Sequence, residues 1–234
     1  MNGVTFGTKH SYDDLDLILS SKEVGLPEPK TETVDVPGAD GSLDLTGALT
    51  DEIKYENRTL TFTFTLLDAL DRWADKLQEV KEYLHGQKMR VIMDDDAAFY
   101  YYGRCKINSY TSSQTLGTLV IEVNAEPYKI DLNSLTEAGT DWLWDPFSFL
   151  TGCIYTDTYT ISGETTITLY CPGMPVSPTF VSDSDMTITF DGTDYDLEAN
   201  TETTWYEIRL SAGENTITVS GSGTLVITYE GGSL

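Results

Sequence analysis

The chain has 234 residues, 40% of them hydrophobic, and a formal net charge of −24 at pH 7. This hydrophobic content is enough for a core and excludes global disorder, while the negative charge argues against binding of a nucleic-acid backbone or an anionic membrane. No apolar run approaches the ~20 residues of a membrane span, and the N-terminus lacks the pattern of a secretory signal, so we expect a soluble chain.

The negative charge is unevenly distributed. Thirteen of the fourteen Lys and Arg lie at or before Lys129, whereas sixteen Asp and Glu and only Arg209 follow it. The part after Lys129 therefore carries −15 and the remainder −9. Such a surface either keeps the protein in solution or lets DNA pass without sticking.

The first segments in chain order are a strand around residues 4–6, a turn, and an apolar run over residues 15–19. Residues 24–49 then contain three prolines and four glycines. Alternation over 31–36 and a turn signal at 38–41 favour an extended hairpin, or arm, over a flexible linker. Because such an arm buries little of itself, we expect it to be covered by a neighbouring chain. The residues expected at that contact are Val34, Val36, Pro37, Gly38, Asp40, Gly41, Leu43 and Leu45.

One helix is predicted, over residues 66–86. Its apolar stripe consists of Leu66, Leu70, Trp73, Ala74, Leu77, Val80 and Leu84, in steps of mostly three and four. Asp68 is the expected N-cap, and Gly86 is expected to end the helix in the left-handed conformation. Residues 55–66 before it alternate between apolar and Thr side chains, as in a half-buried strand. Further strands over 89–93, 99–107 and 115–123, with a turn at 94–98 between the first two, complete a β-barrel-like domain with a single packed helix, which ends near residue 130.

A second domain is predicted from its short strands. Residues 131–150, with Trp142, Trp144, Pro146 and Phe147, are expected to form a connector. Strands over 186–190 and 193–197 flank Asp191-Gly192, which predicts a type I′ hairpin. Strands over 204–210, 216–219 and 224–229 follow, the last two joined by a turn at 220–223. This spacing without helices predicts a β-sandwich over residues 151–234. The fold class is thus mainly β with one α-helix.

Metal and thiol chemistry find little support in the sequence. Cys105, Cys153 and Cys171 are an odd number without a CxxC spacing, so reduced thiols are expected, with a Cys153–Cys171 bridge left open. The clusters Asp94–Asp96 and Asp183–Asp196 offer carboxylates for a cation. The first has no further ligands nearby and the second lacks the EF-hand spacing, so solvated turns are the preferred interpretation and no metal site is predicted.

Catalysis is not predicted either. His10 and His85 are the two histidines, and neither belongs to a recognisable triad pattern. No glycine-rich phosphate loop precedes a helix, so no cofactor is expected. Carbohydrate binding is the alternative function, because Trp205 and Tyr206, followed by Glu207 and Arg209, are expected on a strand of the sandwich. Packing in a core is the commoner role of such aromatic residues.

Several motifs in a common order together resemble the distal tail proteins of long-tailed bacteriophages and prophages. They are GVTFGTKHSYDDLDLIL (3–19), VDVPGADGSLDL (34–45), YENRTLTFTF (55–64), the single helix, DDD with YYYGR (94–104), and EPYK (126–129). The second domain is similar in general character to the galectin-like β-sandwich of these proteins. It has no histidine after His85, unlike the sugar site of true galectins, so sugar binding is not carried over.

The resemblance implies a structural virion protein rather than an enzyme. It implies a hexameric ring at the distal end of a long non-contractile tail, with the arm gripping the next subunit. The ring would dock the tail tube and tape-measure protein on one side and the host-recognition or lysin protein on the other. The protein would then reside at the virion tail tip after assembly in the host cytoplasm, with no sequence-specific nucleic-acid binding and no membrane association.

Overall fold

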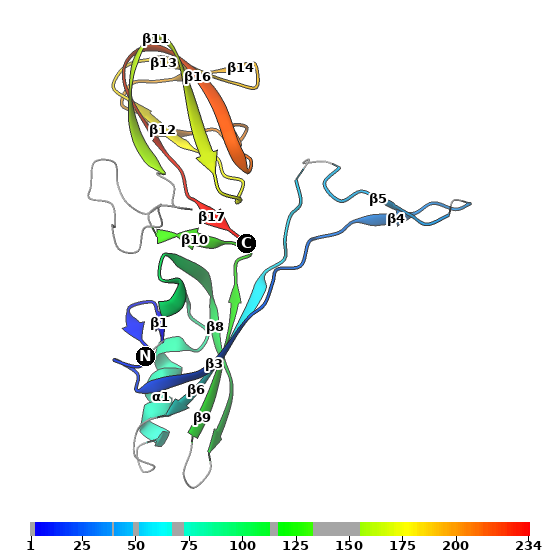
Figure 1. The fold of residues 1–234 in the computed structure, drawn as a ribbon, viewed down its shortest axis with the longest axis vertical. Helices are drawn as coiled ribbons and strands as arrows, with labels where there is room; N and C mark the ends of the chain where they lie inside the picture. The colour runs from blue at the N-terminus through cyan, green and yellow to red at the C-terminus, as the bar shows by residue number, and fades with distance from the viewer. Residues whose placement is uncertain (1–2, 39, 49–51, 67–72, 113–116, 133–154) are drawn as a thin grey trace. The chain divides into compact units, whose positions relative to one another are not determined.

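The computed structural model describes residues 3–38, 40–48, 52–66, 73–112, 117–132 and 155–234 (Figure 1). The chain divides into two compact units. The first comprises Met1–Asp96 and Tyr101–Pro127, and the second Ala97–Tyr100 and Tyr128–Leu234. All strand pairings between named strands are antiparallel, and the described residues contain one α-helix. The predicted fold class, mainly β with one helix, is therefore confirmed.

The first unit is built on one strongly curved, nearly closed sheet. Its strand order is β2-β1-β7-β8-β9-β6-β3. The strands are β1 (Val4–Phe6), β2 (Lys9–His10), β3 (Leu17–Val24), β6 (Arg58–Leu66), β7 (Lys88–Met93), β8 (Phe99–Ser112) and β9 (Gly117–Ala125). A separate two-stranded ribbon consists of β4 (Thr33–Asp35) and β5 (Ser42–Asp44). A short 3-10 turn at Asp94–Asp96 follows β7, within the predicted turn.

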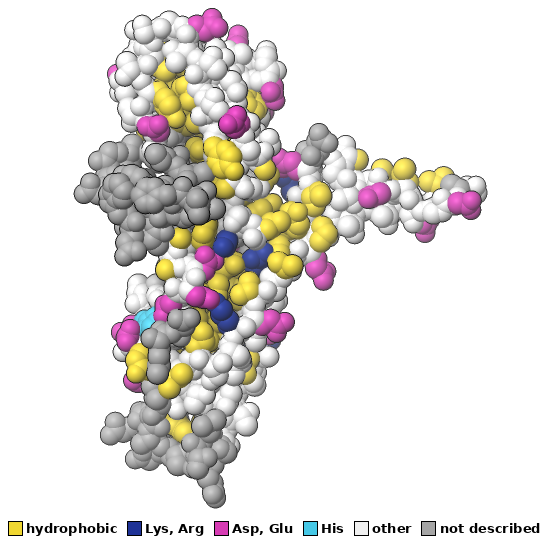
Figure 2. All heavy atoms as spheres, in the orientation of Figure 1, with side chains coloured by type: hydrophobic (Ala, Val, Ile, Leu, Met, Phe, Trp, Pro, Cys, Tyr) yellow, Lys and Arg dark blue, Asp and Glu magenta, His cyan; other side chains and the backbone are white. Residues whose placement is uncertain are grey.

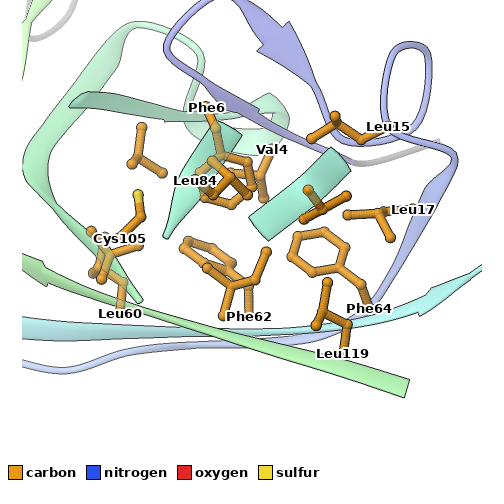
Figure 3. Packing of buried hydrophobic residues seen from close by; sticks show 14 of the residues in the cluster. Val4, Phe6, Leu15, Leu17, Leu60, Phe62, Phe64, Leu84, Cys105 and Leu119 are labelled. Atoms are coloured by element: carbon orange, nitrogen blue, oxygen red, sulfur yellow. The ribbon is translucent and has the colours of Figure 1, made fainter. Parts of the chain in front are cut away.

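The core of this unit follows the alternation of β6. Leu60, Phe62, Phe64 and Leu66 are buried, while the intervening Thr side chains are partly exposed, as predicted. The rings of Phe6 and Phe62 pack edge to face with centroids 5.8 Å apart. Figure 3 shows Leu84 of the helix, Leu119 of β9 and Cys105 of β8 in the same cluster.

The helix α1 spans Trp73–Leu84 and buries Trp73, Leu77, Val80 and Leu84 against the sheet. Its N-terminal boundary differs from the prediction, because Leu66 is the last residue of β6 and not the first turn of the helix. Ala74 is exposed and does not belong to the stripe. Asp68 and Leu70 lie outside the described residues. Gly86 has φ +82°, which confirms its left-handed conformation at the helix end.

The second unit contains a six-stranded sheet centred on a long strand. The path is β14-β13-β16-β12-β15, with β11 paired to β16 along all sixteen of its residues. The strands are β11 (Thr156–Cys171), β12 (Thr179–Ser182), β13 (Met186–Phe190), β14 (Thr193–Leu197), β15 (Thr203–Thr204) and β16 (Gly213–Thr228). Two short strands, β10 (Lys129–Asp131) and β17 (Gly232–Ser233), pair with each other, and β10 also pairs with Phe99 and Tyr100.

The turn between β13 and β14 matches its prediction. Asp191 and Gly192 have φ +47° and +77°, so both central residues are left-handed, as a type I′ turn requires. The strand bounds, Met186–Phe190 and Thr193–Leu197, are also those predicted.

Two predictions in this unit are wrong, and strand β11 was not predicted. Residues 220–223 do not form a hairpin turn, because β16 continues through them while paired with β11. The strand expected over 204–210 is only the two residues of β15, after which the chain turns, with the N–H of Ile208 bonded to the carbonyl of Trp205 at 3.2 Å. No strand was expected over residues 156–171, where β11 lies.

Candidate functional site

The arm is a two-stranded ribbon that prolongs two strands of the sheet. The N–H of Gly25 bonds to the carbonyl of Thr59 at 2.9 Å, just beyond the last β3–β6 pair. An isolated bridge between Pro29 and Tyr55 continues the pairing. Further bonds join Lys30 N to Lys54 O at 2.7 Å and Leu45 N to Glu32 O at 2.8 Å, before β4 pairs with β5. The chain thus leaves β3, forms the ribbon and returns to β6 (Figure 1).

One face of this ribbon is apolar and uncovered. Val34 lies opposite Leu43, and Val36 and Leu45 lie two residues further along their strands, so all four side chains point to the same face. Their exposed fractions are 43%, 55%, 46% and 38%. Figure 2 shows hydrophobic side chains along the arm. Exposed apolar side chains that share one face of a ribbon indicate an interaction surface that is buried on association.

The tip of the arm reverses with two left-handed glycines. Gly38 has φ +88° and Gly41 has φ +77°, a conformation that other residues adopt only with strain. Pro37 and Asp40 are exposed at the same tip. The carboxylate of Asp44 accepts a hydrogen bond from Thr46 N at 2.8 Å, and bonding to Thr46 lowers the pKa of this carboxyl. The predicted arm residues therefore lie together on one exposed hairpin, and their contact with a neighbouring chain remains a prediction.

The two aromatic residues proposed for glycan contact do not form a common platform. Trp205 is half-buried, and its ring packs against Phe180 and Tyr195, with centroid distances of 5.6 and 5.4 Å. Tyr206 follows in a turn and is 82% exposed. The ring of Trp205 is therefore used in packing, and sugar binding by this pair stays an untested prediction.

The acidic clusters make contacts within the protein. Asp94 Oδ2 accepts a hydrogen bond from Gly3 N at 2.6 Å and lies 3.3 Å from His10 Nε2, and Asp95 pairs with Lys22. In the β13–β14 hairpin, the Asp194 and Asp196 carboxylates accept hydrogen bonds from Thr189 and Thr187. Within the part of the chain that the structure describes, no group of three or more His, Cys, Asp or Glu is placed to hold a metal ion.

The remaining candidate groups have structural contacts. His85 Nδ1 accepts a hydrogen bond from Ile107 N at 3.1 Å. Cys105 and Cys171 are buried free thiols, and burial raises the pKa of Cys105 to about 12, far from the range of a reactive thiolate. Cys153 and the predicted connector beyond residue 132 lie outside the described residues. No helix among the described residues is long and apolar enough to cross a membrane.

Sequence reasoning missed Arg58, which is 3% exposed in the core-facing row of β6. Its Nη1 donates to the Tyr101 hydroxyl at 3.3 Å, while Nε and Nη2 have no hydrogen-bond partner. The alternation of β6 places position 58 on the buried face, and this pattern could have identified it as a buried cation.

Comparison with known proteins finds solved structures with the same fold, and one of them matches over the whole chain. The Dit protein (gp 19.1) of phage SPP1, described as a paradigm of the hub adsorption apparatus in phages that infect Gram-positive bacteria, has the same fold. The two structures superpose with a TM-score of 0.68 at 10% sequence identity over 100% of each chain. No protein-family profile and no curated protein matches the sequence. The likeness to distal tail proteins predicted from the motifs is therefore confirmed at the level of the fold.

Proposed function

We propose that this chain is a structural component of a phage tail tip, assembled as a hexameric ring at the distal end of a long non-contractile tail. It docks the tail tube and tape-measure protein on one side and the host-recognition or lysin protein on the other. The observation that carries the proposal is the correspondence of fold with SPP1 Dit over the full length of both chains.

The uncovered apolar face of the arm supports the assembly. Covering Val34, Leu43 and their neighbours removes apolar surface from water, which favours association by about 25 cal/mol per Å². An arm that contacts a different surface of the next copy makes a head-to-tail interface, and such interfaces generate closed rings when the rotation closes. The arm of each subunit therefore grips the next subunit around the ring.

The role is structural rather than enzymatic, and it needs no cofactor. The net charge of −24 supports it, because a negative surface repels the phosphate backbone of DNA that passes through the ring at infection. The protein functions at the virion tail tip after assembly in the host cytoplasm.

Negative-stain microscopy of the purified protein tests the proposal, and annular particles are the expected result. Deleting residues 37–45 removes the tip and the whole of β5, and should abolish the rings while both units still unfold cooperatively at the wild-type temperature. Rings formed by the deletion variant would refute the role of the arm. A wild-type protein that stays monomeric at every concentration, and also fails to form rings when mixed with tail tubes, would refute ring assembly itself.

A further inference from the structure

A hollow lies between the C-terminal half of α1 and strand β8 of the first unit. Its lining comprises Gln78, Lys81, Glu82, His85 and Ile107, and its volume is about 380 Å³. Since a water molecule accounts for ~30 Å³, this space accepts several side chains. An adjoining hollow shares His85 and adds Lys88, Arg104 and Lys106. Ile107 lies on the core-facing side of β8 and Arg104 and Lys106 on its outer side, so the two hollows meet at His85 along the edge of this strand.

The two hollows are lined by four cations and by the acids Glu82 and Glu122, of which Glu122 lies opposite Lys106 in the β8–β9 pairing, and three of the four cations form no ion pair within the described part of the chain. Among the described residues, Lys81, Arg104 and Lys106 form no ion pair, and Arg104 donates only to the carbonyl of Gly86 at 2.6 Å. The other lysines described in the first unit pair with acids, namely Lys9 with Glu79, Lys22 with Asp95, Lys30 with Glu56, Lys54 with Glu52, Lys76 with Asp16 and Glu79, and Lys88 with Glu126. In a chain of net charge −24, unpaired cations gathered in one place indicate a site for an acidic partner.

The backbone of β8 is also open beside this surface. Strand β7 pairs with β8 only at residues 101–104. Beyond them, Cys105 N bonds to Gln87 O at 2.8 Å and Ile107 N bonds to His85. From residue 108 to the end of β8, the pairing in the described part of the sheet is with β9 alone. An open strand edge of this kind accepts another strand by adding to the sheet.

The arm has the complementary chemistry. Residues 31–46 contain four acidic side chains and no basic one. These acids, Glu32, Asp35, Asp40 and Asp44, are exposed and form no ion pair in the described structure. Glu32 lies two residues before Val34, so it shares the apolar face, whereas Asp35 and Asp44 point to the opposite face of the ribbon. The arm thus presents an apolar and acidic ribbon, and the hollow presents the half-buried Ile107 among free cations.

We propose that the hollow around His85 is the receiving surface for the arm of a second copy of this chain. The ribbon lies along the open edge of β8. On one face of the ribbon, Val34 and Leu43 cover Ile107 and Glu32 pairs with Lys81; on the opposite face, Asp35 and Asp44 pair with Arg104 and Lys106. This inference rests on the proposed function, in which the arm is the inter-subunit element, and adds the surface that the arm contacts.

Photo-cross-linking locates the contact directly. Val34 is replaced by a benzophenone amino acid, the variant is mixed with isotope-labelled wild-type protein at the highest soluble concentration, and cross-linked peptides are identified by mass spectrometry. Cross-links from Val34 to residues 78–85 or 106–112 of the labelled copy are expected. Cross-links between copies that map to other residues would refute the hollow as the receiving surface but would keep the arm as the inter-subunit element. The absence of any cross-link between copies would overturn both.

Charge exchange then tests the pairing. Lys81→Glu/Lys106→Glu in the hollow and Glu32→Lys/Asp44→Lys in the arm should each reduce association, measured by sedimentation, by at least about tenfold. Mixing the two variants should restore association, because the lysines of one arm then meet the glutamates of the other hollow. The control, Lys9→Glu/Lys22→Glu, makes the same change in net charge on another surface and should have a smaller effect.

Two results of this experiment count against the inference. Failure of the mixed variants to associate, when deletion of residues 37–45 does abolish wild-type association, would assign the arm to a different surface. Binding of a single-stranded DNA oligonucleotide to the wild-type chain at physiological salt, lost in Lys81→Glu/Lys106→Glu, would assign the hollow to nucleic acid.

Discussion

The carboxylate of Asp183 accepts a hydrogen bond from the backbone N–H of Thr224 at 2.8 Å, and the N–H of Asp183 returns one to the carbonyl of Thr224 at 3.1 Å. These bonds hold the connection from β12 to β13 across the middle of β16. The adjacent Ser184 hydroxyl donates to the carbonyl of Ser222 at 2.5 Å. The connection between β12 and β13 is therefore hydrogen-bonded to β16 close to Gly221 and Gly223, where β16 has no side chains.

Asp183 should make the stability of the second unit depend on pH. The hydrogen bond from Thr224 N lowers the pKa of Asp183 below its ordinary value of 3.8. A carboxyl whose folded pKa is depressed adds stability above its unfolded pKa and loses it as the pH falls through the folded pKa. Asp183→Ala should therefore lower the melting temperature at pH 7, and the difference from wild type should shrink as the pH falls below 3.8.

Thermal unfolding followed by circular dichroism between pH 2 and 7 measures this effect. Asp183→Asn is the control, because it keeps the acceptor oxygen without a titrating charge, and its stability should lack this acid-dependent component. A wild-type-to-alanine difference that stays constant across the range would show that the charge of Asp183 is unimportant.

Gly223→Ala should destabilise the same connection. Gly223 has φ +143°, and an added Cβ would overlap Asp183 Oδ1 and Ser184 Oγ. We expect a loss of about 1–3 kcal/mol in the free energy of unfolding, from backbone strain and displacement of this connection. Urea denaturation measures it. Gly163→Ala is the matched control on β11, since Gly163 has φ +75° with no atom near its Cβ position, and it should cost about 1–2 kcal/mol for the backbone alone. An equal or smaller loss at Gly223 would contradict the steric account.

Val34→Ser/Leu43→Ser should prevent assembly without unfolding the chain. Both side chains are about half exposed in the single copy, so the free energy of unfolding should change by less than about 0.5 kcal/mol per substitution. Their loss removes the centre of the apolar face that we propose a neighbouring copy covers, so annular particles should disappear from negative-stain images. Thr33→Ser/Ser42→Ala, which removes no large apolar side chain from the arm, should keep them. Normal rings in the first variant would mean that this face is not a contact.

Trp205→Ala should act through stability rather than through glycan binding. The ring packs against Phe180 and Tyr195, so its removal should cost about 2 kcal/mol of unfolding free energy. Tyr206→Ala removes an exposed ring and should change stability by less than about 0.5 kcal/mol. A glycan array probed with wild type and both variants supplies the second measurement. A glycan signal lost in Tyr206→Ala, at unchanged stability, would support the carbohydrate-binding alternative instead.

The sequence by itself determined the elements whose signals are local. The alternation of β6 identified its buried face, the stripe through Trp73, Leu77, Val80 and Leu84 identified α1, and Asp191-Gly192 identified a type I′ turn. In each case the decisive contacts repeat every two to four residues or lie within one turn, so neighbours along the chain carry the information.

Only the tertiary structure decided how distant segments meet. Gly221 and Gly223 are typical of a turn, yet pairing with β11 some sixty residues away keeps β16 extended through them. Trp205 lies outside its expected strand, and its ring packs against Phe180 and Tyr195. The free cations Lys81, Arg104 and Lys106 come from α1 and β8 and line two hollows that meet at His85 only after folding. The physical reason is common to all three: the energy comes from partners far apart in sequence, and local propensity is too weak to oppose it.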